Sequence, residues 1–154
     1  MGAVRDLKLI KELYNPLHFR FCMMENYLKN KLGLKRPQDY INSGVLLMDT
    51  ARLRNIHFVE KALFSLQEIK EPLFHDQDLI NRVCQKQICF LPVEWNLCWH
   101  INEDGRVFEN LPPTLYKQFH KAEQKPFLIH YASATKPWHL HQFTPLSYFR
   151  LCSS

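Results

Sequence analysis

The strongest fold signal in this chain is the segment Ile41-Asn42-Ser43-Gly44-Val45-Leu46-Leu47-Met48-Asp49. A continuous apolar run bounded by polar residues is typical of a strand that is buried on both faces. Asp49 or Thr50 then provides an N-cap for a following helix. In that helix the apolar residues recur every three or four positions, at Leu53, Ile56, Val59, Leu63 and Leu66, which predicts one buried face. A strand followed directly by a helix indicates an α/β fold class.

Segments on both sides continue this alternation. Residues 2–7 predict a short strand with Asp6 near its end, and residues 19–32 predict a helix that Gly33 and then Pro37 terminate. After Pro72, acidic residues mark a helix start at Asp76, where they suit the positive end of the helix dipole. No repeat or linker divides the chain, so we expect a single domain over residues 1–154. Further elements are expected at 87–91 (strand), 92–113 (structured loop), 114–124 (helix) and 126–131 (strand).

The composition excludes several classes of protein. The chain has 154 residues, 46% of them apolar and 13% aromatic. This composition is too apolar for a disordered chain, and this length is sufficient to bury a hydrophobic core. No apolar run approaches the ~18–20 residues of a membrane span, and the N-terminus lacks the apolar block of a signal peptide. Only four glycines are present and they never cluster, which excludes a P-loop and a dinucleotide fingerprint. We therefore expect a cytoplasmic protein.

The cysteines form neither a metal motif nor a disulfide framework. Their number is odd, their spacing is irregular and no C-x-x-C pair occurs among Cys22, Cys84, Cys89, Cys98 and Cys152. This pattern excludes a zinc ribbon. We expect reduced thiols that are mostly small core residues, as in a cytosolic chain.

Charge is distributed unevenly along the sequence. The net charge is +5; residues 1–40 carry eight Lys/Arg against four Asp/Glu, residues 41–110 seven against ten, and residues 111–154 five against one. The basic ends suit a phosphorylated small molecule, an anionic lipid surface or simple solvation. Because the sequence contains no basic stripe with interleaved aromatics and no recognition helix, we expect no nucleic-acid partner.

Three groups of residues are candidates for chemistry. His130 ends an apolar strand and Lys136 follows it; a neutral imidazole binds metals and an ammonium neutralises phosphate, although a structural histidine and a surface lysine fit the same pattern. Asp76-Gln77-Asp78 opens a helix and places two carboxylates around an amide. These carboxylates point different ways and would not easily share one ion, and acidic residues at a helix start also serve only the dipole. Asn42 and Ser43 offer hydrogen bonds to ligand hydroxyls, but Asn-Ser-Gly is equally common in turns.

Taken together, the motifs resemble family 8 glycosyltransferases, and in particular the bacterial lipopolysaccharide hexosyltransferases. The order and spacing match over residues 40–138, and Ala3-Val4-Arg5-Asp6 resembles the family strand that precedes them. The matching motifs are Tyr40-Ile41-Asn42-Ser43-Gly44-Val45-Leu46-Leu47-Met48-Asp49, Asp76-Gln77-Asp78-Leu79-Ile80-Asn81, Leu91-Pro92-Val93-Glu94-Trp95-Asn96, and Ile129-His130-Tyr131 with Lys136-Pro137-Trp138.

The resemblance implies a GT-A fold, a UDP-hexose donor, a Mn²⁺ (or Mg²⁺) ion and retention of anomeric configuration. It assigns His130 as a metal ligand and Lys136 to the donor diphosphate. The residues it places around the donor sugar are Asn42, Ser43 and Asp6, with Asp76 and Gln77 beside the anomeric carbon. A divalent ion and Lys136 would stabilise the negative charge that develops on departing UDP.

Two departures from the family pattern change these expectations. Ser133 stands at a substrate-binding position where the family commonly has glycine, and its side chain narrows the approach of the backbone to phosphate. The family's D-x-D metal motif and N-terminal nucleotide-binding strands precede the Ala-Val-Arg-Asp segment and have no counterpart in this chain. Asp76-Gln77-Asp78 also spells D-x-D, but it follows Pro72-Leu73-Phe74 and opens a helix, so it does not replace the missing metal motif. The expected structure is therefore a partial GT-A fold, a mixed sheet flanked by helices, with poor metal affinity.

We thus expect the C-terminal portion of a family 8 catalytic domain. It moves glucose or galactose from a UDP-sugar to a saccharide or lipid-linked acceptor such as the lipopolysaccharide core, and is weak or inactive alone. The basic end favours peripheral contact with the inner face of the membrane. The alternative is a non-catalytic remnant that serves as a partner or regulatory module of a full-length glycosyltransferase.

Overall fold

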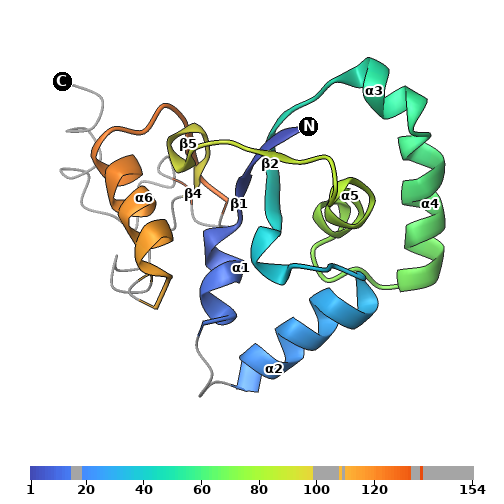
Figure 1. Ribbon diagram of the computed structural model, residues 1–154, viewed down its shortest axis with the longest axis horizontal. Helices are drawn as coiled ribbons and strands as arrows, with labels where there is room; N and C mark the ends of the chain where they lie inside the picture. Colours follow the sequence, from blue (N-terminus) through green and yellow to red (C-terminus); the bar gives the residue numbers. More distant parts are fainter. Residues whose placement is uncertain (15–18, 99–107, 109, 133–135, 137–154) are drawn as a thin grey trace.

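The computed structural model describes residues 1–14, 19–98, 108, 110–132 and 136 (Figure 1). Its central sheet has the strand order β2-β1-β3, with bounds β1 Gly2–Arg5, β2 Ile41–Leu47 and β3 Cys89–Phe90. Strand β1 is antiparallel to β2 and parallel to β3. A second, two-stranded parallel sheet joins β4 (Leu97–Cys98) to β5 (Ile129–His130). The mixed sheet confirms the predicted α/β class.

Helices cover both faces of the central sheet. Helix α6 lies on one side of the strands, and α5 and α4 lie on the other, with α4 outermost (Figure 1). The helices are α1 (Leu7–Glu12), α2 (Phe19–Asn26), a π-helical turn (Tyr27–Lys31), α3 (Thr50–Asn55), α4 (Phe58–Ile69), α5 (Asp76–Cys84), α6 (Pro113–Gln124) and two 3-10 turns (Pro37–Asp39 and Val93–Trp95).

Strand β1 connects two hydrophobic clusters, because successive side chains of a strand point to opposite faces. Ala3 packs with Ile41 and with Ile80 of α5. Val4, its neighbour, belongs to the cluster that contains Phe119 and Ala122 of α6. Strand β1 thus fixes α5 and α6 on opposite sides of the sheet.

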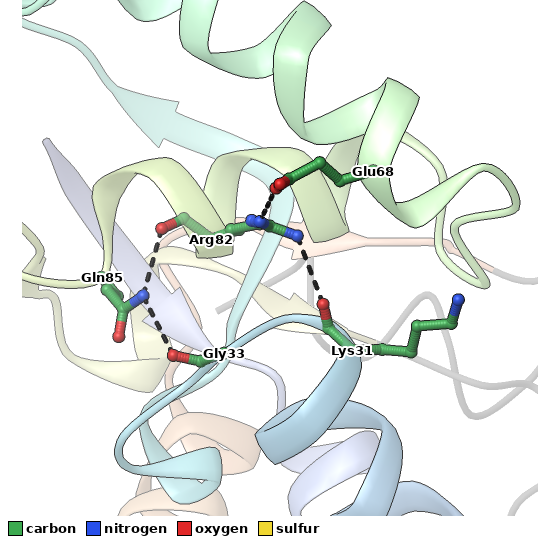
Figure 2. A network of polar contacts seen from close by, with 5 residues as sticks. All are labelled: Lys31, Gly33, Glu68, Arg82 and Gln85. Carbon is green, nitrogen blue, oxygen red and sulfur yellow. Dashed lines mark hydrogen bonds and ion pairs between the residues drawn. The ribbon is translucent and has the colours of Figure 1, made fainter.

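A polar network attaches helix α5 to the turn that follows α2. Arg82 on α5 pairs with Glu68 of α4 and donates a hydrogen bond to the carbonyl of Lys31 at 3.3 Å (Figure 2). Gln85 bridges from the carbonyl of Arg82 (3.2 Å) to that of Gly33 (3.4 Å). Gly33 has a φ of +67°, a conformation that glycine adopts without strain. This confirms the predicted helix end at Gly33 and fixes α4, α5 and the π-helical turn together.

Most of the predicted elements are present, several of them shorter than expected. The helix over 114–124 is α6, the strand over 87–91 contracts to β3, and the strand over 126–131 contracts to β5. Asp49 caps α3, because its carboxylate accepts the backbone N–H of Arg52 at 2.9 Å. The segment predicted as a loop at 92–113 contains the 3-10 turn Val93–Trp95 and strand β4; its residues 99–107 and 109 lie outside the described residues.

The prediction that the 41–49 segment is buried on both faces is wrong beyond Asn42. Ile41 is fully buried, but Leu47 is 68% exposed. The reason is topological: among the described residues, β2 pairs only with β1 and therefore forms an edge of the sheet. An apolar run does not reveal whether a strand has one neighbour or two.

The single helix predicted after Asp49 is also wrong. The chain forms α3 and α4, separated at His57, whose φ of +55° interrupts the helix. Helix α4 buries Ser65 and Ile69, while Val59 and Leu63 are 63% and 57% exposed. The predicted buried face is therefore wrong, because Val59, Leu63 and Leu66 are exposed and α4 buries a different face.

The described cysteines are free thiols, as expected, but they are not mostly core residues. Cys84 is buried, Cys98 is half-buried, and Cys22 and Cys89 are exposed; Cys152 lies outside the described residues. In the described part of the chain, no helix combines the length and the apolar character that a membrane crossing requires.

Candidate functional site

Five polar side chains from separate elements meet beside the edge of β2. Asp6 follows β1, Asn42 lies in β2, Gln77 is in the first turn of α5, Asn96 precedes β4, and His130 ends β5. The antiparallel pairing of β1 with β2 brings Asp6 next to Asn42, since the backbone N–H of Asp6 donates to the carbonyl of Tyr40 at 2.9 Å. The site therefore lies where the two sheets meet.

Asp6 and Gln77 form the first part of the network. Asp6 caps α1, with Oδ1 accepting the N–H of Leu9 at 2.9 Å. Its Oδ2 accepts hydrogen bonds from Gln77 Nε2 (2.9 Å) and Asn42 Nδ2 (3.4 Å). Gln77 Oε1 in turn accepts from Asn42 Nδ2 (3.2 Å) and from the backbone N–H of Ser43 (3.0 Å). Gln77 thus cannot rotate without losing three contacts.

Asn42 and Asn96 extend the network to His130. Asn42 Oδ1 accepts the N–H of Gly44 at 3.0 Å and a hydrogen bond from Asn96 Nδ2 at 2.9 Å. Asn96 Oδ1 lies 3.1 Å from His130 Nδ1. Asn96 is only 2% exposed, so water competes little for these contacts.

The imidazole of His130 lies against the backbone of Gly44. A Cβ placed on Gly44 would lie 2.0 Å from His130 Cε1, so glycine is needed there for close approach rather than for backbone conformation. Burial, and next the positive charge of Lys136, lower the pKa of His130, while the carboxylate of Asp6 opposes the shift. The imidazole is therefore neutral near pH 7, the state that binds metals.

Lys136 and Cys98 complete the surroundings of His130. Lys136 Nζ donates a hydrogen bond to the carbonyl of Tyr131. The Cys98 thiol lies 3.6 Å from His130 Nδ1. Burial raises the pKa of Cys98 to about 12, the charge of Asp6 adds to this shift, and the charge of Lys8 opposes it. Cys98 is consequently a protonated thiol near neutral pH.

The two aspartates of the Asp76-Gln77-Asp78 motif have different surroundings. Asp78 is fully buried and accepts hydrogen bonds from the hydroxyls of Tyr27 and Tyr40, both at 2.6 Å, and from the N–H of Phe74 at 2.9 Å. Burial, with the negative charge and hydrogen bonds of Asp78, raises the pKa of both tyrosines. Asp76 is exposed. The pair therefore does not form a two-carboxylate site.

A cavity of about 800 Å³ adjoins the network at Asp6. It extends between α1, α2 and the turn before α5, and most of its walls are apolar. Its lining includes Asp6, Leu9, Met24, Tyr27, Leu73 and Phe74.

One residue of this site fits the role of metal ligand, but a full ligand set is not present in the described chain. Among contacts between described residues, His130 uses Nδ1, which leaves Nε2 for a ligand. No group of three or more His, Cys, Asp or Glu side chains suited to hold a metal occurs within the described ranges.

Comparison with known proteins decides the family. Residues 1–142 match the sequence profile of Glycosyl transferase family 8. The chain belongs to this family. A lipopolysaccharide 1,2-glucosyltransferase of Escherichia coli K12 is 32% identical over 117 residues, which cover 73% of this chain and 32% of that protein. General stress protein A of Bacillus subtilis is 29% identical over 104 residues, covering 64% of this chain and 35% of that protein.

A solved structure gives the same fold. The apo structure of the WbbM bifunctional glycosyltransferase is similar with a TM-score of 0.74 and 26% identity, over 89% of this chain and 25% of that one. This similarity confirms the expected GT-A-like fold. The chain spans about a third of the length of the curated relatives it matches.

The residues that the family 8 resemblance singled out are mostly brought together. Asp6, Asn42, Gln77 and His130 share one network, and Ser43 joins it through its backbone N–H. Lys136 lies close enough to His130 to shift its pKa. Asp76 has no hydrogen bond or ion pair to another described residue, and Ser133 lies outside the described residues.

Sequence reasoning missed two residues of this region, Asn96 and Cys98. Asn96 ends one of the matching motifs, so its position was a usable signal. Nothing in the sequence indicated Cys98. The expectation that Asp76 and Asp78 do not share one ion agrees with their different surroundings, because neighbouring helical residues point different ways.

Proposed function

We propose that this chain is the sugar-facing part of a retaining family 8 hexosyltransferase that uses UDP-glucose or UDP-galactose. The observation that carries the proposal is the network from Asp6 through Gln77, Asn42 and Asn96 to His130. It gathers carboxylate, amide and imidazole groups, which are the donors and acceptors that recognise sugar hydroxyls and diphosphate oxygens.

In this proposal the donor lies along β2. Asn42, Ser43 and Asp6 bind hydroxyls of the hexose, and the Lys136 ammonium pairs with the diphosphate. Mn²⁺ or Mg²⁺, when bound, would stabilise the negative charge on the departing UDP. His130 would supply one ligand to that ion. The remaining ligands would come from elsewhere, since the described residues contain no group of three metal-binding side chains.

Retention requires a group on the sugar face opposite UDP. We assign Gln77 to that position, because three hydrogen bonds hold its amide before any sugar binds, and preorganised dipoles stabilise developing charge most effectively. The carboxylate of Asp76, exposed beside it, adds negative charge near the cationic sugar. The acceptor hydroxyl then attacks from the side that UDP leaves.

The cavity beside Asp6 gives the acceptor a place next to the sugar. Asp6 lines the cavity and also belongs to the network. A saccharide acceptor such as the lipopolysaccharide core would place its reacting hydroxyl at Asp6 and its remainder against the largely apolar walls. The E. coli relative acts on lipopolysaccharide by its name, which supports this class of acceptor.

Donor binding by the whole chain tests the proposal. UDP-glucose or UDP-galactose with Mn²⁺ is titrated while backbone NMR signals are followed. We expect Ser43, Gln77 and His130 signals to move. Lys136→Ala should weaken donor binding by about 10-fold or more, the loss of one charge-assisted hydrogen bond. Lys117→Ala, which removes an exposed lysine of α6, is the matched control.

Two outcomes contradict the proposal in different ways. If saturating donor moves no signal in the network, or if both lysine variants bind alike, the donor site is wrong and the alternative of a partner module gains support. If the isolated chain hydrolyses UDP-hexose at a substantial rate with Mn²⁺, the donor site is right but the expected weak activity is wrong.

A further inference from the structure

Asn96 is the residue that connects the sugar-facing amides to His130, yet the motif match gives it no role. It lies between the 3-10 turn Val93–Trp95 and strand β4, and it is almost fully buried. Its side-chain nitrogen donates to Asn42 Oδ1 at 2.9 Å, and its side-chain oxygen lies 3.1 Å from His130 Nδ1 and also accepts a hydrogen bond from the Cys98 thiol at 3.7 Å.

The direction of these contacts is fixed by the backbone of β2. The N–H groups of Ser43 and Gly44 can only donate, so Gln77 Oε1 and Asn42 Oδ1 must be the atoms that face them. Asn42 Oδ1 is therefore an acceptor toward Asn96, and the atom of Asn96 nearest to it must be Nδ2. This places Asn96 Oδ1, an acceptor, opposite His130 Nδ1.

An acceptor opposite Nδ1 selects one form of the neutral imidazole. Neutral histidine carries a single ring proton, and a proton on Nδ1 leaves the lone pair on Nε2. The ring also lies against the backbone of Gly44, where a Cβ would overlap it. The Cys98 thiol donates to Asn96 Oδ1 at 3.7 Å and lies 3.6 Å from His130 Nδ1. If the thiol instead donated to Nδ1, it would favour the other form of the imidazole, with the proton on Nε2.

We propose that Asn96 is a positioning residue whose side-chain oxygen keeps the proton of His130 on Nδ1 and so presents the Nε2 lone pair to a ligand. This inference rests on the proposed function, in which Nε2 is a ligand of the divalent ion at the donor diphosphate. A hydrogen bond to the other ring nitrogen is the usual means by which proteins orient a metal-binding histidine.

The first test is the tautomer of His130 in the whole chain without metal or nucleotide. Two-bond ¹H–¹⁵N correlation spectra of ¹⁵N-histidine-labelled protein at about pH 8, where an ordinary imidazole is neutral, distinguish the two forms. His130→Gln identifies the His130 signals by their loss. We expect the proton on Nδ1. A proton on Nε2 overturns the proposal.

Three variants separate Asn96 from Cys98. Asn96→Leu removes the acceptor at similar size, so His130 should shift toward the form with its proton on Nε2. Asn96→Asp keeps an oxygen toward Nδ1 and should keep a proton there, but its second oxygen then faces the acceptor Asn42 Oδ1, so this variant should be less stable. Cys98→Ala should retain the wild-type form. A wild-type tautomer in Asn96→Leu, a changed one in Cys98→Ala, or the loss of the Nδ1 proton in Asn96→Asp overturns the proposal. If Asn96→Leu does not fold, the wild-type spectrum still decides, because a proton on Nε2 overturns the proposal.

A titration with Mn²⁺ alone then tests whether Asn96 affects metal binding by His130. Paramagnetic broadening of the His130 signals gives the apparent affinity, which Asn96→Leu should weaken about 10–100-fold and Cys98→Ala should leave unchanged. If the tautomers behave as expected but Mn²⁺ broadens His130 in no variant, the metal role of the proposed function fails while the tautomer assignment stands. If Asn96→Leu binds Mn²⁺ as well as wild type, the positioning role fails.

Discussion

Gly44 shapes the site through its missing side chain. The ring of His130 occupies the space of a Cβ at this position, with contacts of 2.0 to 2.8 Å to all three nearest ring atoms. We expect Gly44→Ala to displace the imidazole and to lower the free energy of unfolding by about 1–3 kcal/mol, as overpacked sites do. Urea denaturation measures the loss of stability, and the His130 NMR signals report the displacement.

Gly33→Ala is the matched control for that substitution. Gly33 has a φ of +67° and no atom within 4 Å of an added Cβ, so alanine there introduces backbone strain of about 1 kcal/mol without a clash. The His130 signals should stay in place. If both alanine variants move them equally, His130 does not depend on the space above Gly44.

The buried Asp78 contributes to stability, whereas the exposed Asp76 should contribute little. Asp78 is buried and accepts three hydrogen bonds, one of which Asn cannot accept in the same geometry. We expect Asp78→Asn to lower the free energy of unfolding by about 1–3 kcal/mol. Asp76→Asn, two residues away and exposed, should change it by less than about 0.5 kcal/mol. Equal losses of stability in urea denaturation would mean that the three hydrogen bonds to Asp78 do not stabilise the fold.

At this scale the sequence predicted residue types better than partners. The motifs pointed to Asp6, Asn42, Gln77 and His130, and the structure joins them in one network. Asn96 was missed as the link because its role depends on which strand lies beside it. Local sequence does not encode that neighbour, since β4 and β5 are separated by residues 99–128.

Helix ends show where individual elements deviate from ideal backbone geometry. Lys70 ends α4 with a φ of +64°, which costs a residue with a side chain more than glycine. We expect Lys70→Gly to raise the free energy of unfolding by about 0.5–1 kcal/mol. Lys61→Gly, the same change in the exposed middle of α4, should lower it by about 1 kcal/mol. Thermal and urea denaturation measure the change in the free energy of unfolding for both variants. A loss of stability in both would contradict the assignment of backbone strain to Lys70.

Elements were predictable where local chemistry determines them. Asp49 at the start of α3 and Gly33 after the π-helical turn mark ends that the structure confirms. The errors concern surroundings instead: the exposed Leu47 and Leu63 have the residue types of a core. Their exposure depends on which strand or helix covers them, and a periodic pattern contains no information about that.

For the whole molecule, the site is a junction between its two sheets. Two contacts connect strand β2 to the β4–β5 pair. Asn96 donates a hydrogen bond to Asn42, and the ring of His130 lies against Gly44. A change at His130 should therefore affect the stability of the whole fold and not only ligand binding.

Protonation of His130 provides that change. Burial and Lys136 lower its pKa in the folded state below the ordinary 6.5, so between these two values the unfolded chain binds more protons than the folded one. The free energy of unfolding must then fall as the pH is lowered through about 6.5, by at most about 1.4 kcal/mol per pH unit for one group. Urea denaturation from pH 7.5 to 5 should show this loss, and His130→Gln should show a shallower one. A steeper or unchanged slope in His130→Gln would mean that the folded state does not disfavour the imidazolium, and that the ring is not held between Gly44, Asn96 and Lys136 as described.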